Sequence, residues 1–323
     1  MWRALDNPAL GFMNEFSDSI ADLQRRNLQL VPELRQSKTL IAVSDYGGAH
    51  RALGFEAYSL LITCGDSWNA WEEARLRVRQ DFDLEKRRFA FSKMGDNRKR
   101  RALSAFLSTA DLLHGLSVTV LIDKRIVSLF SAGAQHDPSI AARLSPGGHY
   151  TRGTFERLMR AVHLVSFFVA GLSGPGQNLI WLTDEDEIAA NPARLTGLTA
   201  IFANVASHYL HHTLGHLRCG TTASDNGSLQ IEDMAAIPDL VGGALTELIT
   251  AYHREGCMPS GTLIAPAPPN LISKAREVIR WLSVEPISLK RLVYVIQPEP
   301  QSHALTLTRL LLHSVPFPVT RNG

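Results

Sequence analysis

The sequence feature that most limits the possible folds of this chain is a set of four short apolar runs. Each run contains an aspartate or is followed by one. The first three precede Asp45, Asp123 and the triplet Asp184-Glu185-Asp186, and the fourth contains Pro238-Asp239 and is typical of a helix start. Strands rich in Val, Ile and Leu that end in Asp place carboxylates at one edge of an α/β sheet. Converging carboxylates repel one another unless a cation lies among them. The pattern therefore predicts an α/β fold with a divalent metal site.

The size and composition indicate a globular protein. The chain has 323 residues, 45% hydrophobic and 20% charged, which is enough for a large core. The longest apolar stretch, 161–172, is too short to span a bilayer, and the N-terminal residues lack a signal-peptide pattern. Cys64, Cys219 and Cys257 are odd in number and far apart, which disfavours a disulfide framework. We expect a cytoplasmic protein that does not enter the membrane.

A strongly basic window covers residues 75–101. It holds eleven Lys and Arg residues and four acids, a net charge of +7 in a chain whose total is +2. One interpretation is a solvated helical face with internal ion pairs. The other is a nucleic-acid-binding patch, because clustered cations gain affinity for phosphates through counterion release. On the second interpretation the contacting residues are Arg87, Arg88, Arg98, Lys99, Arg100 and Arg101.

Periodicity and turn signals predict the order of the elements. We expect an N-terminal helical extension over 1–37 and a C-terminal helix with a β-hairpin over 257–323, on either side of an α/β unit over 38–256. The predicted strands are 40–45, 54–63, 117–123 and 179–183 in the unit and 289–296 and 304–312 beyond it, and the predicted helices include 98–114, 153–170, 191–216, one from Pro238 to about 256, and 271–283. The second strand is expected to be antiparallel to the first. Prolines 266, 268 and 269 are interpreted as a linker.

Several short motifs occur in an order that resembles a known family. Ser44-Asp45-Tyr46-Gly47 ends the first strand, Phe91-Ser92-Lys93-Met94 follows the second, and Ile122-Asp123-Lys124 ends the third. Two candidate helix starts come later, Leu229-Gln230-Ile231-Glu232-Asp233 and Asp239-Leu240-Val241-Gly242-Gly243. Over roughly residues 38–256 the set resembles the RNase H-like superfamily and, within it, the bacterial family called domain of unknown function 3800.

The resemblance implies a mixed central sheet flanked by helices and a metal-dependent nuclease or other phosphodiesterase, in which two Mg²⁺ or Mn²⁺ ions activate water and stabilise the leaving oxygen. It implies ligands among Asp45, Asp123 and Asp239, with Asp45 bridging both ions and Lys93 close to the scissile phosphate. Asp233 is an alternative to Asp239, and Asp184 is favoured over Glu185 and Asp186 by its place at the strand end. A role in bacterial antiphage defence or in a mobile-element system, with nucleic acid and a protein partner bound, follows from the resemblance alone.

Two alternatives to a nuclease remain open. The first is a catalytically silent protein of this fold that binds nucleic acid or a partner protein in a larger assembly. The second is a different α/β metal hydrolase that uses His208, His212 and His216, which would share one face of the helix predicted over 191–216.

Overall fold

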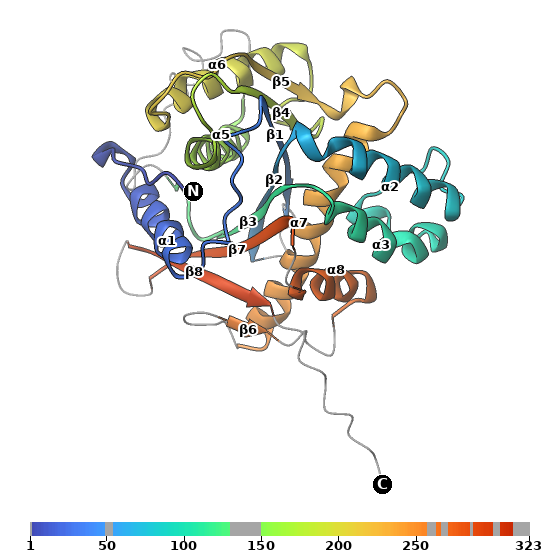
Figure 1. Ribbon diagram of the computed structural model, residues 1–323. Coiled ribbons are helices and arrows are strands. Elements are labelled where there is room, and N and C mark those ends of the chain that lie inside the picture. The colour runs from blue at the N-terminus through green and yellow to red at the C-terminus, as the bar shows by residue number, and fades with distance from the viewer. Residues whose placement is uncertain are drawn as a thin grey trace.

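A mixed sheet of eight strands organises the molecule (Figure 1). The computed structural model describes residues 2–48, 54–129, 150–256, 263–265, 271–284, 287–299 and 304–312. The strands are β1 (Thr39–Gly47), β2 (Phe55–Cys64), β3 (Gly115–Asp123), β4 (Asn178–Thr183), β5 (Leu217–Thr221), β6 (Leu263–Ala265), β7 (Leu289–Pro298) and β8 (Leu305–Leu312). The α-helices are α1 (Phe12–Arg26), α2 (Trp68–Asp81), α3 (Asn97–Ala110), α5 (Arg152–Leu172), α6 (Pro192–Tyr209), α7 (Gln230–Arg254) and α8 (Ser273–Ser283). The linker prolines and Cys257 lie outside the described residues.

The strand order is β5-β4-β1-β2-β3-β7-β8-β6. β1 and β2 are antiparallel, as predicted, and so are β2 and β3. β4 lies parallel to β1, and β5 lies parallel to β4. The predicted β-hairpin forms from β7 and β8, and β7 joins the sheet parallel to β3. The mixed α/β sheet flanked by helices that the sequence predicts is confirmed.

Helices cover both faces of the sheet because its strands are apolar on both faces. In β1, Leu40 and Ala42 belong to the core that α1, α5 and α6 share, whereas Ile41 and Val43 belong to the core that α2, α3, α7 and α8 share. Side chains of a strand alternate between faces, so Asp45 lies on the α7 face. The odd-numbered position of Asp45 in β1 therefore places its side chain on the side of the sheet that α7 covers.

Helix α7 begins eight residues before the predicted helix start at Pro238. The Asp225 carboxylate accepts hydrogen bonds from the backbone N–H groups of Gly227, Leu229 and Ile231 and thereby caps the turn that leads into α7. Pro238 lies inside the helix. The interpretation of Asp239 as a helix-start residue is therefore wrong, and Asp239 lies in the third turn.

By length and composition, α7 is the one helix among the described residues that could cross a bilayer. However, 78% of its apolar window is buried inside the protein. It packs mainly on β1 and β2 as a core helix.

Helix α6 is shorter than predicted. It ends at Tyr209, Leu210 is extended, and the chain turns through residues 210–216 into β5. His212 and His216 therefore lie beyond the helix, and the expected shared helical face of three histidines does not exist. Residues 217–221 instead pair with β4, a long-range interaction that their local pattern does not indicate.

Candidate functional site

Two aspartates lie next to each other at the ends of neighbouring parallel strands. In the β1–β4 register, Ser44 is opposite Thr183, so that Asp45 and Asp184 follow on adjacent strands. Asp45 is half-buried and Asp184 is exposed. The apolar runs that precede them set this arrangement, because each run fills a central strand and ends at the same edge of the sheet.

Helix α7 brings a third aspartate above this edge. Gly242 lies against β2 so closely that a Cβ there would be 2.6 Å from the Ser59 hydroxyl, and Ser59 is the cross-strand partner of Asp45. Asp239 is three residues before Gly242 and therefore lies on the same side of the helix. Close packing at a glycine thus brings a carboxylate of α7 to the end of β1.

The loop after β4 adds Asp186 to the group. The Ile188 N–H donates to Oδ1 of Asp186 at 3.0 Å, and Thr222 Oγ donates to Oδ1 of Asp184 at 2.9 Å. Both carboxylates are thus held by donors of neighbouring segments. Glu185 between them is exposed. We call Asp45, Asp184, Asp186 and Asp239 the acidic cluster.

Burial and mutual repulsion disfavour ionisation of the acidic cluster. Burial and then the charges of Asp239, Asp184 and Asp186 raise the pKa of Asp45 well above its usual value. Burial, with further repulsion from Asp184, raises the pKa of Asp239 to about 6, and the pKa of Asp186 is raised to about 6 by the same two causes. Carboxylates that repel one another in this way favour a cation between them.

A short segment containing a predicted site lysine is attached to Asp239. The Phe91 N–H donates to Oδ2 of Asp239 at 2.6 Å, and Lys274 of α8 donates to the Phe91 carbonyl at 2.7 Å. The Lys274 ammonium also lies 4.1 Å from the centre of the Phe91 ring. Gly243 leaves room for that ring, since a Cβ at Gly243 would be 2.3 Å from it. Both polar groups of the Phe91 peptide are thus held by side chains from two helices.

This attachment places two cations beside the acidic cluster. Lys93, which is exposed, and Lys274 both lower the pKa of Asp239 and so oppose the effect of burial. Lys93 was predicted from the motif order. Lys274 was not, because it lies beyond the resembling region and no local motif marks it.

The structure does not bring Asp123 to the acidic cluster. Thr119 is at the level of Asp45 across β2, and Asp123 is four residues further along β3, roughly 13 Å along the strand direction. Arg125 binds the Asp123 carboxylate, with Nη2 2.7 Å from Oδ2. Asp123 thus has a cationic partner of its own.

Asp233 lies in a buried ion-pair network instead. Arg79 binds both of its oxygens, and Arg75 donates to Oδ2 at 3.0 Å. Glu72 in turn binds Arg75. The network fastens α2 to the first turn of α7 and occupies the Asp233 carboxylate, which leaves Asp239 as the α7 aspartate of the acidic cluster.

Much of the basic window forms ion pairs within the protein. Arg87 pairs with Asp96, Arg98 with Asp83, and Arg88 with Glu232. Lys99 is buried and donates to the Arg88 carbonyl. Arg100 and Arg101 are exposed. The interpretation as a solvated face with internal ion pairs thus accounts for most of these residues.

The chemistry of the acidic cluster suits a hard divalent cation, because carboxylate oxygens are the ligands that Mg²⁺ and Mn²⁺ prefer. Among the residues that the structure describes, no three His, Cys, Asp or Glu side chains form a group that could hold a metal ion as they stand. The carboxylates of the acidic cluster thus match such an ion in ligand type, whereas their present positions are not those of a formed metal site.

Comparison with known proteins finds similarity among solved structures only. No protein-family model matches it, and no curated protein does. Among solved structures, the ribonuclease H2 of Pyrococcus horikoshii OT3 is similar at 13% sequence identity and a TM-score of 0.30. The similarity covers 75% of this chain and 99% of that one.

Proposed function

We propose that this protein is a metal-dependent nuclease or other phosphodiesterase whose centre is the acidic cluster. The observation that carries the proposal is the convergence of Asp45, Asp184 and Asp239 at one edge of the sheet, where burial and the neighbouring carboxylates raise the pKa of Asp45. A group whose ionisation is so strongly perturbed at the edge of a sheet is a functional-site candidate. The order of the sequence motifs supports the finer proposal of a bacterial protein of the family called domain of unknown function 3800, active in antiphage defence or in a mobile-element system. The three scattered cysteines support the proposal of a cytoplasmic location.

In the proposed site, Asp45 and Asp239 are the principal ligands of Mg²⁺ or Mn²⁺, and Asp184 and Asp186 complete the donor set. Such an ion supplies a nucleophilic water at neutral pH and compensates the charge that develops on the phosphate. Two ions are possible in a set of four carboxylates. Asp123 and Asp233 are left out of this proposal because arginines bind their carboxylates.

In this proposal, Lys93 binds the substrate phosphate and Lys274 positions Lys93. Lys93 is exposed beside Asp239, where its ammonium attracts a phosphate group as a point charge. Lys274 holds the Phe91 carbonyl and thereby positions the segment that carries Lys93. The Phe91 N–H keeps one oxygen of Asp239 in a fixed orientation, which leaves the other oxygen for the ion.

Exposed cations next to this segment suit a nucleic-acid backbone. Arg100 and Arg101 at the start of α3 are the exposed members of the predicted patch for which the structure gives no acidic partner among the described residues. We propose them as phosphate contacts in place of the full set of six. Contacts of this kind make binding sensitive to salt.

The test is cleavage of labelled single- and double-stranded DNA and RNA with Mg²⁺ or Mn²⁺. Cation-dependent cleavage that is lost in Asp45→Asn and retained in Asp123→Asn supports the proposal and identifies the substrate. Cleavage that survives Asp45→Asn contradicts it. Salt-sensitive binding without cleavage of any substrate favours the catalytically silent alternative.

A further inference from the structure

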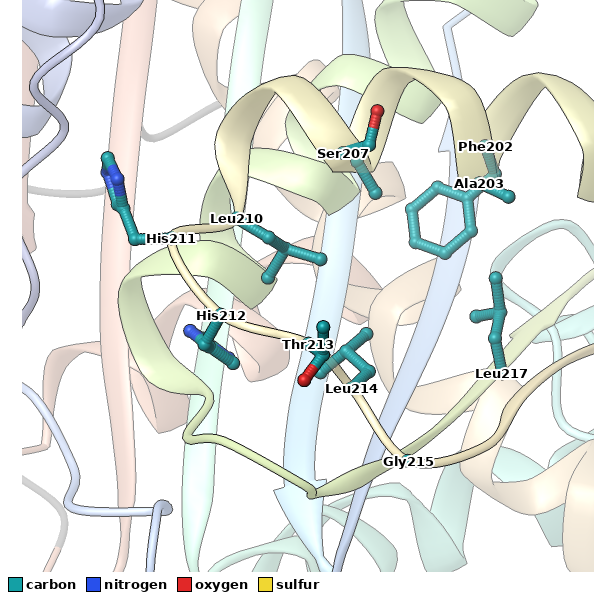
Figure 2. A pocket seen from close by; sticks show the side chains of 11 residues that line it. Phe202, Ala203, Ser207, Leu210, His211, His212, Thr213, Leu214, Gly215 and Leu217 are labelled. Carbon is teal, nitrogen blue, oxygen red and sulfur yellow. The ribbon is translucent and has the colours of Figure 1, made fainter.

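A groove lies at the far side of the sheet from β8, between the end of α6 and β5 (Figure 2). It has a volume of about 600 Å³, which is in the range of ligand-binding sites. Phe202 and Leu217 line one end of it, and Leu210, His211 and His212 line the other. We call it the β5 groove.

The β5 groove is bordered by a strand that lies at the edge of the sheet among the described residues. β5 ends the strand order and pairs with β4 alone among the described strands. The Leu179 N–H donates to the His216 carbonyl, which therefore points toward β4. Backbone groups alternate along a strand in a parallel pair, so those of Leu217 and Cys219 point outward. A row of outward backbone groups is a template for another strand.

The surroundings of the groove are cationic. No Asp or Glu occurs from residue 188 to 224, and His211 and His212 of this stretch line the groove. Arg3 donates to Nδ1 of His212 at 2.7 Å, and Ser173 Oγ lies 3.0 Å from Nε2 of the same ring. Burial and then the charges of Arg3 and Arg35 lower the pKa of His212. The groove wall at His212 thus lies beside Arg3, while Glu33 partly offsets the charge of Arg35.

We propose that the β5 groove binds an extended acidic peptide segment of a partner protein, which adds to the sheet as a strand beside β5. Its backbone pairs with Leu217 and Cys219, one apolar side chain enters the space between Phe202 and Leu217, and its carboxylates face the cations around His212. This is the recognition mode in which main-chain hydrogen bonds give affinity and a pocket for alternate side chains gives specificity. The groove and the acidic cluster lie at opposite ends of β5. The groove is near the start of the strand, and Thr222, just past its end, contacts Asp184 of the acidic cluster.

The test uses a fluorescein-labelled peptide of two Val-Ser-Asp-Ser repeats (the Val-Asp peptide), in which Val and Asp share one face of an extended strand. A peptide of two Val-Ser-Lys-Ser repeats (the Val-Lys peptide) serves for comparison. Binding is followed by fluorescence anisotropy. We expect saturable binding of the Val-Asp peptide and binding of the Val-Lys peptide that is weaker by about tenfold or more. Binding should also slow hydrogen exchange in residues 215–221.

Two variants on one helix separate the groove from the rest of the surface. Ala203→Trp fills the groove from an exposed rim position and should weaken peptide binding by about tenfold, whereas Asn204→Trp adds the same side chain at an exposed position outside the groove and should not. Cys219→Pro removes an outward N–H, as edge strands tolerate, and should weaken binding similarly.

Three outcomes overturn the proposal. The first is the absence of saturable binding up to about 1 mM peptide, where even weak specific binding registers. The second is equal binding to Ala203→Trp and Asn204→Trp. The third is a dimer of this chain that is abolished by Ala203→Trp and is not displaced by the peptide. In that case the groove is occupied by a second copy of the chain.

Discussion

The backbone N–H of Phe91 lies 2.6 Å from Oδ2 of Asp239, although the two residues are 148 positions apart in the chain. This hydrogen bond joins a short 3₁₀ turn, Phe91–Lys93, to the middle of a long buried helix. It fixes the orientation of one carboxylate of the acidic cluster and the position of Lys93 at the same time. The following predictions test what this arrangement and its surroundings do.

Asp45→Asn should stabilise the metal-free protein at pH 7.5 by about 1–2 kcal/mol, because it removes a carboxylate that burial and three neighbouring charges disfavour. The same change should abolish stabilisation by Mg²⁺ or Mn²⁺. Urea unfolding with EDTA and with each cation measures both effects. Asp123→Asn is the matched control, because it loses the pair with an exposed arginine. We expect its free energy of unfolding to change by no more than about 1 kcal/mol. It should keep the cation response, by which we mean stabilisation by Mg²⁺ or Mn²⁺. Destabilisation by Asp45→Asn would contradict the prediction.

Asp233→Asn and Asp239→Asn should have opposite consequences. The first leaves two buried arginines short of their partner and should lower the free energy of unfolding by about 3–5 kcal/mol while the cation response persists below the lowered Tm. The second should cost little stability and remove the cation response. Thermal unfolding with and without Mn²⁺ distinguishes the two aspartates, and a cation response lost only in Asp233→Asn would reverse their roles.

Gly243→Ala should displace the Phe91 segment, since its Cβ would lie 2.3 Å from the Phe91 ring. Overpacking of this kind typically costs about 1–3 kcal/mol. Gly153→Ala provides the comparison, because that glycine lies in α5 with open space around its Cβ position. It should be neutral or stabilising by up to about 1 kcal/mol. Equal stability of the two variants in urea unfolding would show that the Phe91 segment is not held tightly.

Lys274→Met should lower cleavage activity by about tenfold, because the Phe91 carbonyl loses its donor and the segment carrying Lys93 becomes less ordered. The expected loss of stability is about 0.5–1.5 kcal/mol, that of one hydrogen bond. Lys86→Met, at an exposed position in the basic window, should leave both quantities unchanged. Lys274→Arg should restore part of the activity, and full activity of Lys274→Met would exclude the positioning role.

The stability of the protein should depend on His212 below about pH 6.5. Burial and neighbouring arginines lower the pKa of His212 in the folded protein, so the unfolded chain binds more protons there. Its contribution to stability is therefore complete above pH 6.5 and is lost as the pH falls through that value. His212→Gln should lose less stability than the wild type between pH 7.5 and 5.5 in urea titrations, with His216→Gln behaving like the wild type. Identical slopes for all three proteins would contradict this assignment.

The central strands could be predicted from the sequence because each apolar run there corresponds to a strand that is buried in the sheet. The apolar runs before Asp45 and Asp184 are buried strands, and both aspartates end at one edge. Asp123 follows the same local pattern, but β3 extends further than β1 at this edge, and strand stagger is a tertiary property.

The other differences arise from one local cap that the sequence motifs do not mark and from long-range interactions. The start of α7 depends on the Asp225 carboxylate, which caps the turn before it, so the local signal at Pro238-Asp239 was misleading. β5 is defined by pairing with β4 rather than by its own residues. Lys274 reaches Phe91 from a helix 183 residues later, and no motif indicates such a contact.

The most direct test of the central claim is calorimetric titration of Mn²⁺ into the metal-free protein at pH 7.5. We predict saturable binding to the wild type and to Asp123→Asn, and loss of that binding in Asp45→Asn and Asp239→Asn. Binding that persists unchanged in both of the latter variants, or that is absent from the wild type, would contradict the assignment of the acidic cluster as the metal site.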